Sequence, residues 1–290
     1  MYPPVFEYIS ASSLPETLDL LVTHGAEAKV LAGGQSLIPL MKLRLVRPTM
    51  LIDINGLKEL RYIKRDSEGL AIGALTRLAD IEAAQLEPGY EILKDSVKVI
   101  ADPQVRHLGT IGGNCAHGDP GNDLPAVLIA LNAVYRLQSK RGTREVAARD
   151  FYHAPFETAL RPTELLTEIR IPRWGVKSSG AYVKLKRRVG DYAIAAVAVQ
   201  VELSENGIIR RAGIAYTNLG PTPIAGDAVA HAIEGERGLD DALATAEGAV
   251  AKVGLKPSSD LRGPDWYKLE MAKVLTVRAL KTAIQRAMER

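Results

Sequence analysis

The sequence predicts an α+β fold in two parts, on three observations. Before residue 172, short apolar runs that read as strands alternate with helical patterns. A polar stretch rich in glycine and serine, 172–180, then interrupts the pattern and indicates a domain boundary. Beyond it, three apolar stretches of strand length follow one another, and only helical patterns come after them. Runs of strands followed by runs of helices are typical of α+β domains.

The first element expected is a helix that ends at Gly25. Serine at 12 and 13 supplies a cap, and a proline and an acidic residue follow in the first turn. The further elements expected before the boundary are strands at 29–32, 50–54 and 70–74, helical stretches at 37–45, 78–85 (capped by Thr76), 90–100 and 124–131, and a hairpin that joins 134–137 to 144–147. Those expected after it are strands at 181–186, 193–203 and 208–217, with an Asn206-Gly207 turn, and helices at 239–253 and 266–288.

Composition excludes several classes of function. The chain has 290 residues, a net charge of +3 and dispersed basic residues, which gives no case for nucleic acid. The start of the chain lacks the pattern of a signal peptide, and no apolar run has transmembrane length. The single cysteine, Cys115, rules out a disulfide framework or an iron–sulfur cluster built by this chain alone. We therefore expect a cytoplasmic protein, with the inner face of the membrane as a second location.

Two glycine pairs carry the main functional signal. They lie in the segments 32–36 (Ala-Gly-Gly-Gln-Ser) and 110–114 (Thr-Ile-Gly-Gly-Asn). Glycine allows φ > 0, and successive exposed N–H groups then form a nest that binds anions. Two such segments, each with a polar residue after the glycines, predict one diphosphate ligand held from both sides. The motifs G-x-G-x-x-G and G-x-x-x-x-G-K-[ST] do not occur, so the predicted nucleotide site is not of the Rossmann or P-loop type.

The acidic segment after the second pair suits the sugar part of such a ligand. Asp119 and Asp123 would repel a phosphate, but they can accept hydrogen bonds from ribose or ribitol hydroxyls. The alternative is that Asp119 is a turn residue and Asp123 a helix N-cap. The five histidines show no metal-binding spacing, and no nucleophile and base are paired in a known pattern. The sequence therefore indicates a protein that holds a cofactor, which carries the chemistry.

Three segments together resemble the FAD-binding subunits of the molybdenum hydroxylases, the family of aerobic carbon monoxide dehydrogenase and bacterial xanthine dehydrogenase. They are 29–41, 110–125 and 181–193. The resemblance implies a PCMH-type fold, similar to vanillyl-alcohol oxidase, in residues 1–175, with subdomains at about 1–55 and 56–175. It implies a C-terminal domain, 176–290, with a three-stranded antiparallel sheet and a helical bundle.

The resemblance also implies a set of residues that bind FAD without a covalent bond. The first glycine segment would hold the pyrophosphate through backbone amides, and the second would hold it from the other side. The residue at 123 would bind sugar or ribitol hydroxyls, and those at 166, 184 and 192 would lie near the flavin ring, where the lysine would stabilise the anionic reduced form. The implied cofactor-binding residues are Lys29, Val30, Leu31, Ala32, Gly33, Gly34, Gln35, Ser36, Ile100, Thr110, Ile111, Gly112, Gly113, Asn114, Asp119, Asp123, Leu166, Lys184 and Tyr192.

The resemblance finally implies an electron-transfer role within a complex. A large subunit with a molybdenum cofactor would act on the substrate, and a small subunit with two 2Fe–2S clusters would relay electrons to FAD. FAD would pass them to an external acceptor, a quinone or NAD, in a dimer of heterotrimers (a heterohexamer). Two alternatives remain at this point: a stand-alone FAD oxidase of the vanillyl-alcohol oxidase class, and a nucleotide-binding scaffold without redox function.

Overall fold

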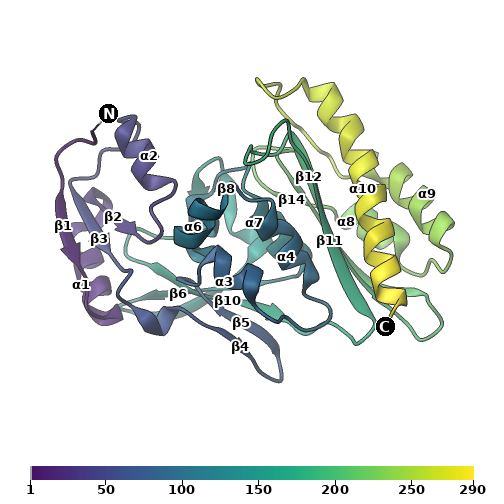
Figure 1. Cartoon of the computed structure of the whole chain (residues 1–290), viewed down its shortest axis with the longest axis horizontal. Coiled ribbons are helices and arrows are strands. Elements are labelled where there is room, and N and C mark those ends of the chain that lie inside the picture. Colours follow the sequence, from purple (N-terminus) through teal and green to yellow (C-terminus); the bar gives the residue numbers. More distant parts are fainter. Residues whose placement is uncertain (1) are drawn as a thin grey trace.

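Three larger sheets, each with its own apolar core, follow one another along the chain (Figure 1). The computed structural model describes residues 2–290. The first sheet and its two helices form one end of the molecule, the second sheet lies in the middle, and the third sheet with the C-terminal helices forms the other end. Helices and strands therefore mix as the α+β prediction requires, and that fold class is confirmed.

The first sheet is parallel, with its third strand in the centre. The predicted first helix is present: the side chain of Ser13 caps it by accepting the N–H of Glu16 at 3.3 Å, and Gly25 (φ 52°) ends it. The elements of this part are β1 (Glu7–Ser10), α1 (Leu14–His24), β2 (Ala28–Leu31), α2 (Leu37–Lys42) and β3 (Met50–Asp53).

The second sheet has five strands in the order β4-β5-β10-β6-β7, and helices cover one of its faces (Figure 1). The α7 helix is apolar on all sides and buried along its whole length, as expected for a helix between two layers. The strands are β4 (Ile63–Arg65), β5 (Gly69–Gly73), β6 (Val134–Ser139), β7 (Gly142–Ala147) and β10 (Leu165–Pro172), and β8 (Tyr152–Ala154) and β9 (Glu157–Thr158) form a separate pair. The helices are α3 (Leu78–Ala83), α4 (Glu91–Lys98), α5 (Pro103–Leu108), α6 (Ile111–His117) and α7 (Asp123–Ala130).

Two expectations for this part were wrong. Thr76 does not cap α3: its hydroxyl instead donates to the carbonyl of Tyr62 and accepts that residue's N–H, at 2.9 and 3.1 Å, and Arg77 occupies the cap position. The second glycine pair is not a loop, because Thr110 caps α6 and both glycines lie in its first turn. A threonine before a glycine pair fits a helix start as well as it fits a turn.

The third sheet is antiparallel and has four strands where three were expected. The extra strand, β14, has only two residues, too few to give a periodic signal. The strands are β11 (Ser178–Leu185), β12 (Ala195–Leu203), β13 (Ile209–Thr217) and β14 (Ile224–Ala225), and the helices are α8 (Asp227–Ile233), α9 (Leu239–Ala249) and α10 (Asp265–Met288). Within residues 2–290 there are also four single turns of 3₁₀ helix: Gly25–Glu27, Lys58–Leu60, Ala148–Asp150 and Val250–Lys252. The expected domain boundary, between 175 and 176, falls between β10 and β11.

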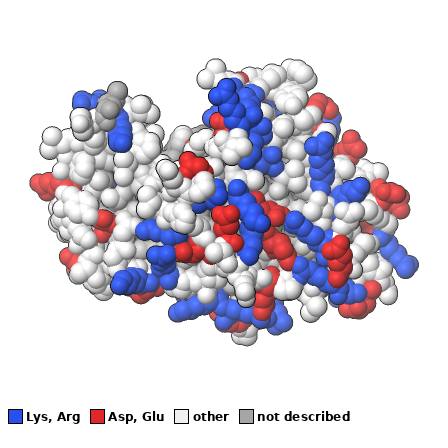
Figure 2. Space-filling view, viewed as in Figure 1, with Lys and Arg blue, Asp and Glu red and all other residues white. Residues whose placement is uncertain are grey.

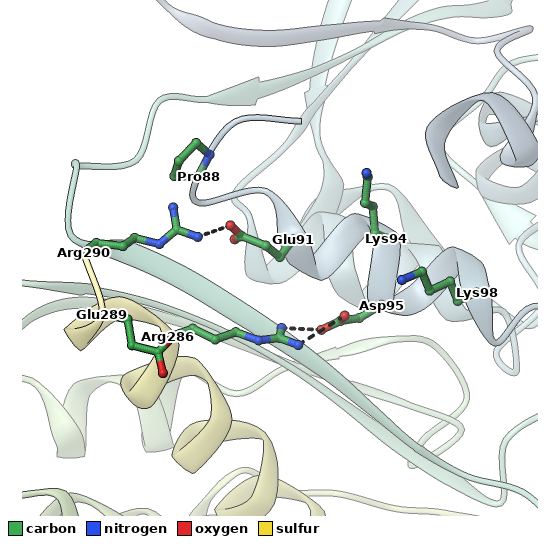
Figure 3. Close-up of a pocket in the computed structure, with 8 residues that line it drawn as sticks. All are labelled: Pro88, Glu91, Lys94, Asp95, Lys98, Arg286, Glu289 and Arg290. Atoms are coloured by element: carbon green, nitrogen blue, oxygen red, sulfur yellow. Dashed lines mark hydrogen bonds and ion pairs between the residues drawn. The ribbon is translucent and has the colours of Figure 1, made fainter. Parts of the chain in front are cut away.

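Ion pairs fasten the end of α10 to α4, across a shallow groove (Figure 3). The Arg286 guanidinium lies 2.6 Å from the Asp95 carboxylate and donates to the carbonyl of Gly180 at 2.7 Å. Arg290 pairs with Glu91 one turn earlier on α4. These contacts join the last helix to the middle part of the molecule, which carries nine of the nineteen predicted site residues.

Replacing Arg286 with methionine is expected to lower the free energy of unfolding by about 1 kcal/mol. A hydrogen bond to a charged group contributes about 1.5–3 kcal/mol, and partial exposure of this pair reduces that value. Lys273→Met is the matched control, because Lys273 pairs at 2.8 Å with Glu270 on the exposed face of the same helix. Denaturant unfolding of the full chain measures both, and equal losses in the two variants would contradict the role given to Arg286.

Candidate FAD site

The first glycine segment presents a row of free backbone N–H groups. The N–H groups of 32–36 donate no hydrogen bond within residues 2–290. The carbonyls of 31–34, in contrast, are all occupied: they accept from the N–H of Ile54 (3.0 Å), Asn55 Nδ2 (2.7 Å), Gln35 Nε2 (3.1 Å) and the N–H of Ile38 (3.0 Å), in that order. Within a planar trans peptide the C=O and N–H point in opposite directions, so the N–H groups of 32–35 face away from these partners. Gly34 has φ 70°, and such left-handed residues are typical of anion nests.

The side chain of Gln35 makes a contact within this segment. Its side chain donates to the carbonyl of Gly33 in its own turn, at 3.1 Å. It therefore stabilises the turn that exposes the N–H groups.

The second glycine segment has its N–H groups already bonded inside the protein. Those of Ile111 and Gly112 donate to the carbonyls of Thr76 and Ala74, at 3.0 and 2.9 Å. That of Gly113 donates to the Thr110 hydroxyl at 3.1 Å, and that of Asn114 donates to the Thr110 carbonyl at 3.0 Å. The predicted grip on a diphosphate from this side therefore cannot use these four amides as they stand, and the group left over here is the Asn114 side chain.

The Asn114 carboxamide has an unused polar atom. Its Oδ1 is buried and has no hydrogen-bond partner within the described residues. Buried polar atoms are nearly always paired in folded proteins, so an unpaired one at a predicted site indicates a missing ligand or water.

The fold brings the two glycine segments side by side. A Cβ on Gly33 would lie 2.3 Å from the Leu108 carbonyl oxygen and 2.8 Å from the Gly109 Cα, and one on Gly113 would lie 3.9 Å from the Ala32 Cβ. Only glycine allows the first of these approaches. Figure 2 shows the surface hollowed between the part that carries β1–β3 and the part that carries β11 and β12, and α6 lies beneath this hollow (Figure 1).

Asp123 and Lys184 form a buried ion pair. The Lys184 ammonium lies 2.8 Å from one Asp123 oxygen and 3.2 Å from the Val99 carbonyl, and the Tyr182 hydroxyl donates to the other Asp123 oxygen at 2.6 Å. Burial raises the pKa of Asp123, while the contacts with Lys184 and Tyr182 oppose that shift. Asp123 is the first residue of α7 and follows the cap position, and both of its oxygens already have protein partners.

Tyr192 is partly exposed. Its ring packs against Gly121, where a Cβ would come within 2.9 Å, and the Arg262 guanidinium lies 5.5 Å from the ring centre. Burial and the nearby charge of Asp119 raise the pKa of Tyr192 to about 12, so the phenol keeps its proton at neutral pH. Asp119 accepts the N–H of Gly121 at 2.8 Å, the turn role considered as its alternative.

A second ion pair, in which only the lysine is buried, holds the loop that places Arg262 over Tyr192. The Lys268 side chain is fully buried and donates to Asp260 and to the Ser258 carbonyl, both at 2.9 Å. Asp260 in turn accepts the N–H of Arg262 at 2.8 Å. These residues were not predicted, because nothing in the sequence links a loop at 258–263 to Tyr192.

Ile100 and Leu166 lie in the apolar core of the middle part. Leu166 pairs with Leu137 in the sheet, and the Ile100 carbonyl accepts from Arg106 at 3.0 Å. With both side chains in the core, any contact with a cofactor falls to their backbones, and their assignment stays a prediction.

Cys115 is expected to resist thiol reagents in the folded protein. It is fully buried, and burial raises the pKa of its thiol to about 12, so almost no thiolate forms at pH 8. A colorimetric thiol assay should detect no fast-reacting group in the native chain and one after denaturation. Rapid reaction of the native protein would contradict this burial and would require a different environment for α6.

Free N–H groups lie beside a second glycine segment, and the chain has no Rossmann or P-loop motif. This arrangement suits a diphosphate-containing nucleotide. Comparison with known families specifies the nucleotide. Residues 4–174 match the FAD binding domain in molybdopterin dehydrogenase, and residues 180–283 match the CO dehydrogenase flavoprotein C-terminal domain. The chain therefore belongs to the FAD-binding medium subunits of the molybdenum hydroxylases, and it is an oxidoreductase flavoprotein subunit with FAD as its cofactor.

Individual relatives match over their full length. The chain is 42% identical to the carbon monoxide dehydrogenase medium chain of Afipia carboxidovorans, over 99% of both sequences. It is 41% identical to the glyceraldehyde dehydrogenase medium chain of Sulfolobus acidocaldarius, over 97% of this chain and 99% of the relative. The structure is similar to that of reconstituted CO dehydrogenase from Oligotropha carboxidovorans, with a TM-score of 0.95, 41% identity, and coverage of 99% of this chain and 100% of the other.

The residues present fit the cofactor. The free N–H groups of 32–36 can bind a diphosphate, the unpaired Asn114 Oδ1 faces no protein partner, and Gly33 and Gly113 keep the adjoining surface free of side chains. Across the described residues 2–290, no helix is both long enough and apolar enough to cross a membrane.

Proposed function

We propose that this chain receives electrons from two 2Fe–2S clusters of a small partner subunit and delivers them, through FAD, to an external acceptor that is a quinone or NAD. A large subunit with a molybdenum cofactor would carry out the substrate chemistry. Relatives of similar identity support this division of labour. They are named for enzymes of carbon monoxide, glyceraldehyde and 6-hydroxypseudooxynicotine, at 42%, 41% and 37% identity. That relatives named for such different substrates match this chain at similar identity, each over nearly its whole length, agrees with substrate choice on another subunit.

The main support for the proposed diphosphate site is the row of free N–H groups at 32–36. We assign the diphosphate to these groups, with the Asn114 side chain on the opposite side. The remaining assignments follow the family resemblance: Lys29 to Leu31 and Ile100 beside the nucleotide, Asp119 and Asp123 toward the sugar or ribitol, and Leu166, Lys184 and Tyr192 at the flavin end. The proposed domains are 1–175, with subdomains at about 1–55 and 56–175, and 176–290.

FAD supplies chemistry in both one- and two-electron steps, which suits a link between clusters and an acceptor. The protein's residues orient it and set its surroundings. Tyr192 keeps its proton and can donate a hydrogen bond. Lys184 carries a positive charge that would favour a negatively charged reduced cofactor, but Asp123 at 2.8 Å offsets much of that charge.

The proposed assembly is a dimer of heterotrimers in the cytoplasm, with the inner face of the membrane as an alternative location. Co-expression of the tagged chain with its large and small partner subunits should yield a complex that contains molybdenum, iron and flavin in fixed ratio. Recovery of the tagged chain alone under these conditions would contradict the assembly.

A visible spectrum tests the core of the proposal. The purified chain should show the absorption bands of oxidised flavin, and acid precipitation should release the flavin into the supernatant. Anaerobic mixing with a reduced small subunit should then bleach the bands. A chain that stays colourless after incubation with FAD would refute the proposed site, and flavin that bleaches only with substrate, in the absence of partners, would favour a stand-alone oxidase.

A further inference from the structure

Asn55 and Arg77 connect the two glycine segments through a chain of hydrogen bonds. Asn55 follows the end of β3, and its Nδ2 donates to the Ala32 carbonyl at 2.7 Å. Its Oδ1 accepts from Arg77 Nη2 at 2.7 Å, and Arg77 Nη1 donates to the Leu108 carbonyl at 2.5 Å. The chain of contacts therefore runs from the first glycine segment to the residues just before the second. Neither residue belongs to the site inferred from the family.

The orientation of the Asn55 carboxamide is fixed by its neighbours. The Asp53 carboxylate accepts from both the backbone N–H and the Nδ2 of Asn55, at 2.8 and 2.7 Å. Its other oxygen accepts from the Tyr8 hydroxyl at 2.5 Å. Since a carboxylate and a carbonyl can only accept, and a guanidinium can only donate, one orientation of the carboxamide satisfies all these groups.

These contacts determine what the first glycine segment exposes. With the Ala32 carbonyl held by Asn55, the N–H of Gly33 in the same peptide plane points the opposite way, to the side free of protein partners. Arg77 holds the Leu108 carbonyl, which lies 2.3 Å from the place that a Cβ of Gly33 would take. The pair thus sets both the direction of one N–H group and the distance between two backbone segments.

We propose that Asn55 and Arg77 are positioning residues for the FAD diphosphate, which keep the free N–H of Gly33 oriented and the two glycine segments in contact before the cofactor binds. The inference rests on the proposed placement of the diphosphate at these segments. A nest that is already ordered binds without the entropy loss of arranging it, so loosening it weakens affinity. Arg77 acts here through two directed hydrogen bonds to different acceptors, which a lysine ammonium on a flexible stem does not reproduce.

Four full-chain variants test the proposal: Asn55→Ala, Arg77→Met, Arg77→Lys and the control Arg61→Met. Arg61 pairs at 2.9 Å with Asp80 of α3 and is exposed, so its replacement removes the same charge near Arg77 without touching either segment. Dissociation constants for FAD are measured after removal of bound flavin, and those for ADP by competition. Loss of a hydrogen bond to a charged group predicts that Asn55→Ala and Arg77→Met raise the FAD constant about 10- to 100-fold. Arg77→Lys should resemble Arg77→Met, and Arg61→Met should stay within about twofold of the unmodified chain.

The ADP measurement locates the effect. ADP carries the diphosphate without the flavin, so the constants for ADP and FAD should rise by similar factors, while the absorption bands of each variant saturated with FAD keep their shape.

Constants within twofold of the unmodified chain in both Asn55→Ala and Arg77→Met would overturn the proposal. Full recovery in Arg77→Lys would also overturn it, because the effect would then be due to charge alone. If Asn55→Ala does not fold, the dissociation constants of Arg77→Met and Arg77→Lys test the proposal by the same criteria. Failure of the unmodified chain to bind FAD would instead refute the proposed site itself.

Discussion

Replacement of Gly33 by alanine is expected to abolish tight FAD binding. The new Cβ would lie 2.3 Å from the Leu108 carbonyl oxygen and 2.8 Å from the Gly109 Cα. Both neighbours are backbone atoms, so they cannot rotate away as a side chain would, and the first glycine segment must move off the second. Overpacking of this kind costs about 1–3 kcal/mol, which corresponds to a loss of up to about 100-fold in affinity if it falls on the bound state. Titration of the flavin-free chain with FAD measures it.

Gly248→Ala provides the matched control for this substitution. Gly248 lies in α9, and a Cβ there would meet nothing within 4 Å. That variant should bind FAD normally and gain a little stability, because alanine favours the helix by about 1 kcal/mol over glycine. If Gly33→Ala bound FAD as tightly as Gly248→Ala, close contact between the two segments would not be needed for the site.

The sequence predicted elements well where a periodic pattern was long and failed where pairing is determined by distant parts of the chain. The strands β12 and β13 and the last helix were placed within a few residues. In β12 larger apolar residues alternate from 197 to 203, and in the last helix the buried residues recur at helical spacing. The central strand of the middle sheet, β10, was missed, although Ile169, Arg170 and Ile171 alternate. A short alternating run gives a weak local signal, and the position of β10 between β5 and β6 depends on residues about 30 to 100 positions away.

The candidate site was also predictable only in part. The two glycine segments were found from residue types alone, and the fold places them in contact. The bonding within them could not be predicted, because whether an N–H is free depends on carbonyls such as those of Ala74 and Thr76, which approach only in the folded chain. Asn55 had a detectable signal: it follows a strand parallel to the one that ends at the first glycine segment, and carboxyl ends of parallel strands meet at one edge of a sheet. Arg77 had none.

Lys184→Met is expected to lower the free energy of unfolding by about 3–5 kcal/mol, because it leaves Asp123 buried without its cation. The remaining partner, the Tyr182 hydroxyl at 2.6 Å, cannot neutralise the charge. The loss should depend on pH in a defined direction. Without the lysine, burial holds the pKa of Asp123 above its value of about 3.9 in the unfolded chain. The folded variant then binds more protons than the unfolded one, so its stability falls as pH rises above about 4.

The double variant Asp123→Asn/Lys184→Met separates this charge effect from a packing effect. An asparagine at 123 needs no cation, so the double variant should recover much of the stability lost in Lys184→Met and should lose its extra pH dependence. Urea unfolding at pH 5 and pH 8 provides the comparison. The same variants test Lys184 as a charge near the flavin. Lys184→Met removes the cation alone and should lower the reduction potential of the bound FAD, whereas the double variant removes the whole neutral pair and should change the potential little. If Lys184→Met were as stable as the unmodified chain at pH 8, the ion pair between Asp123 and Lys184 would not contribute to stability as the structure indicates.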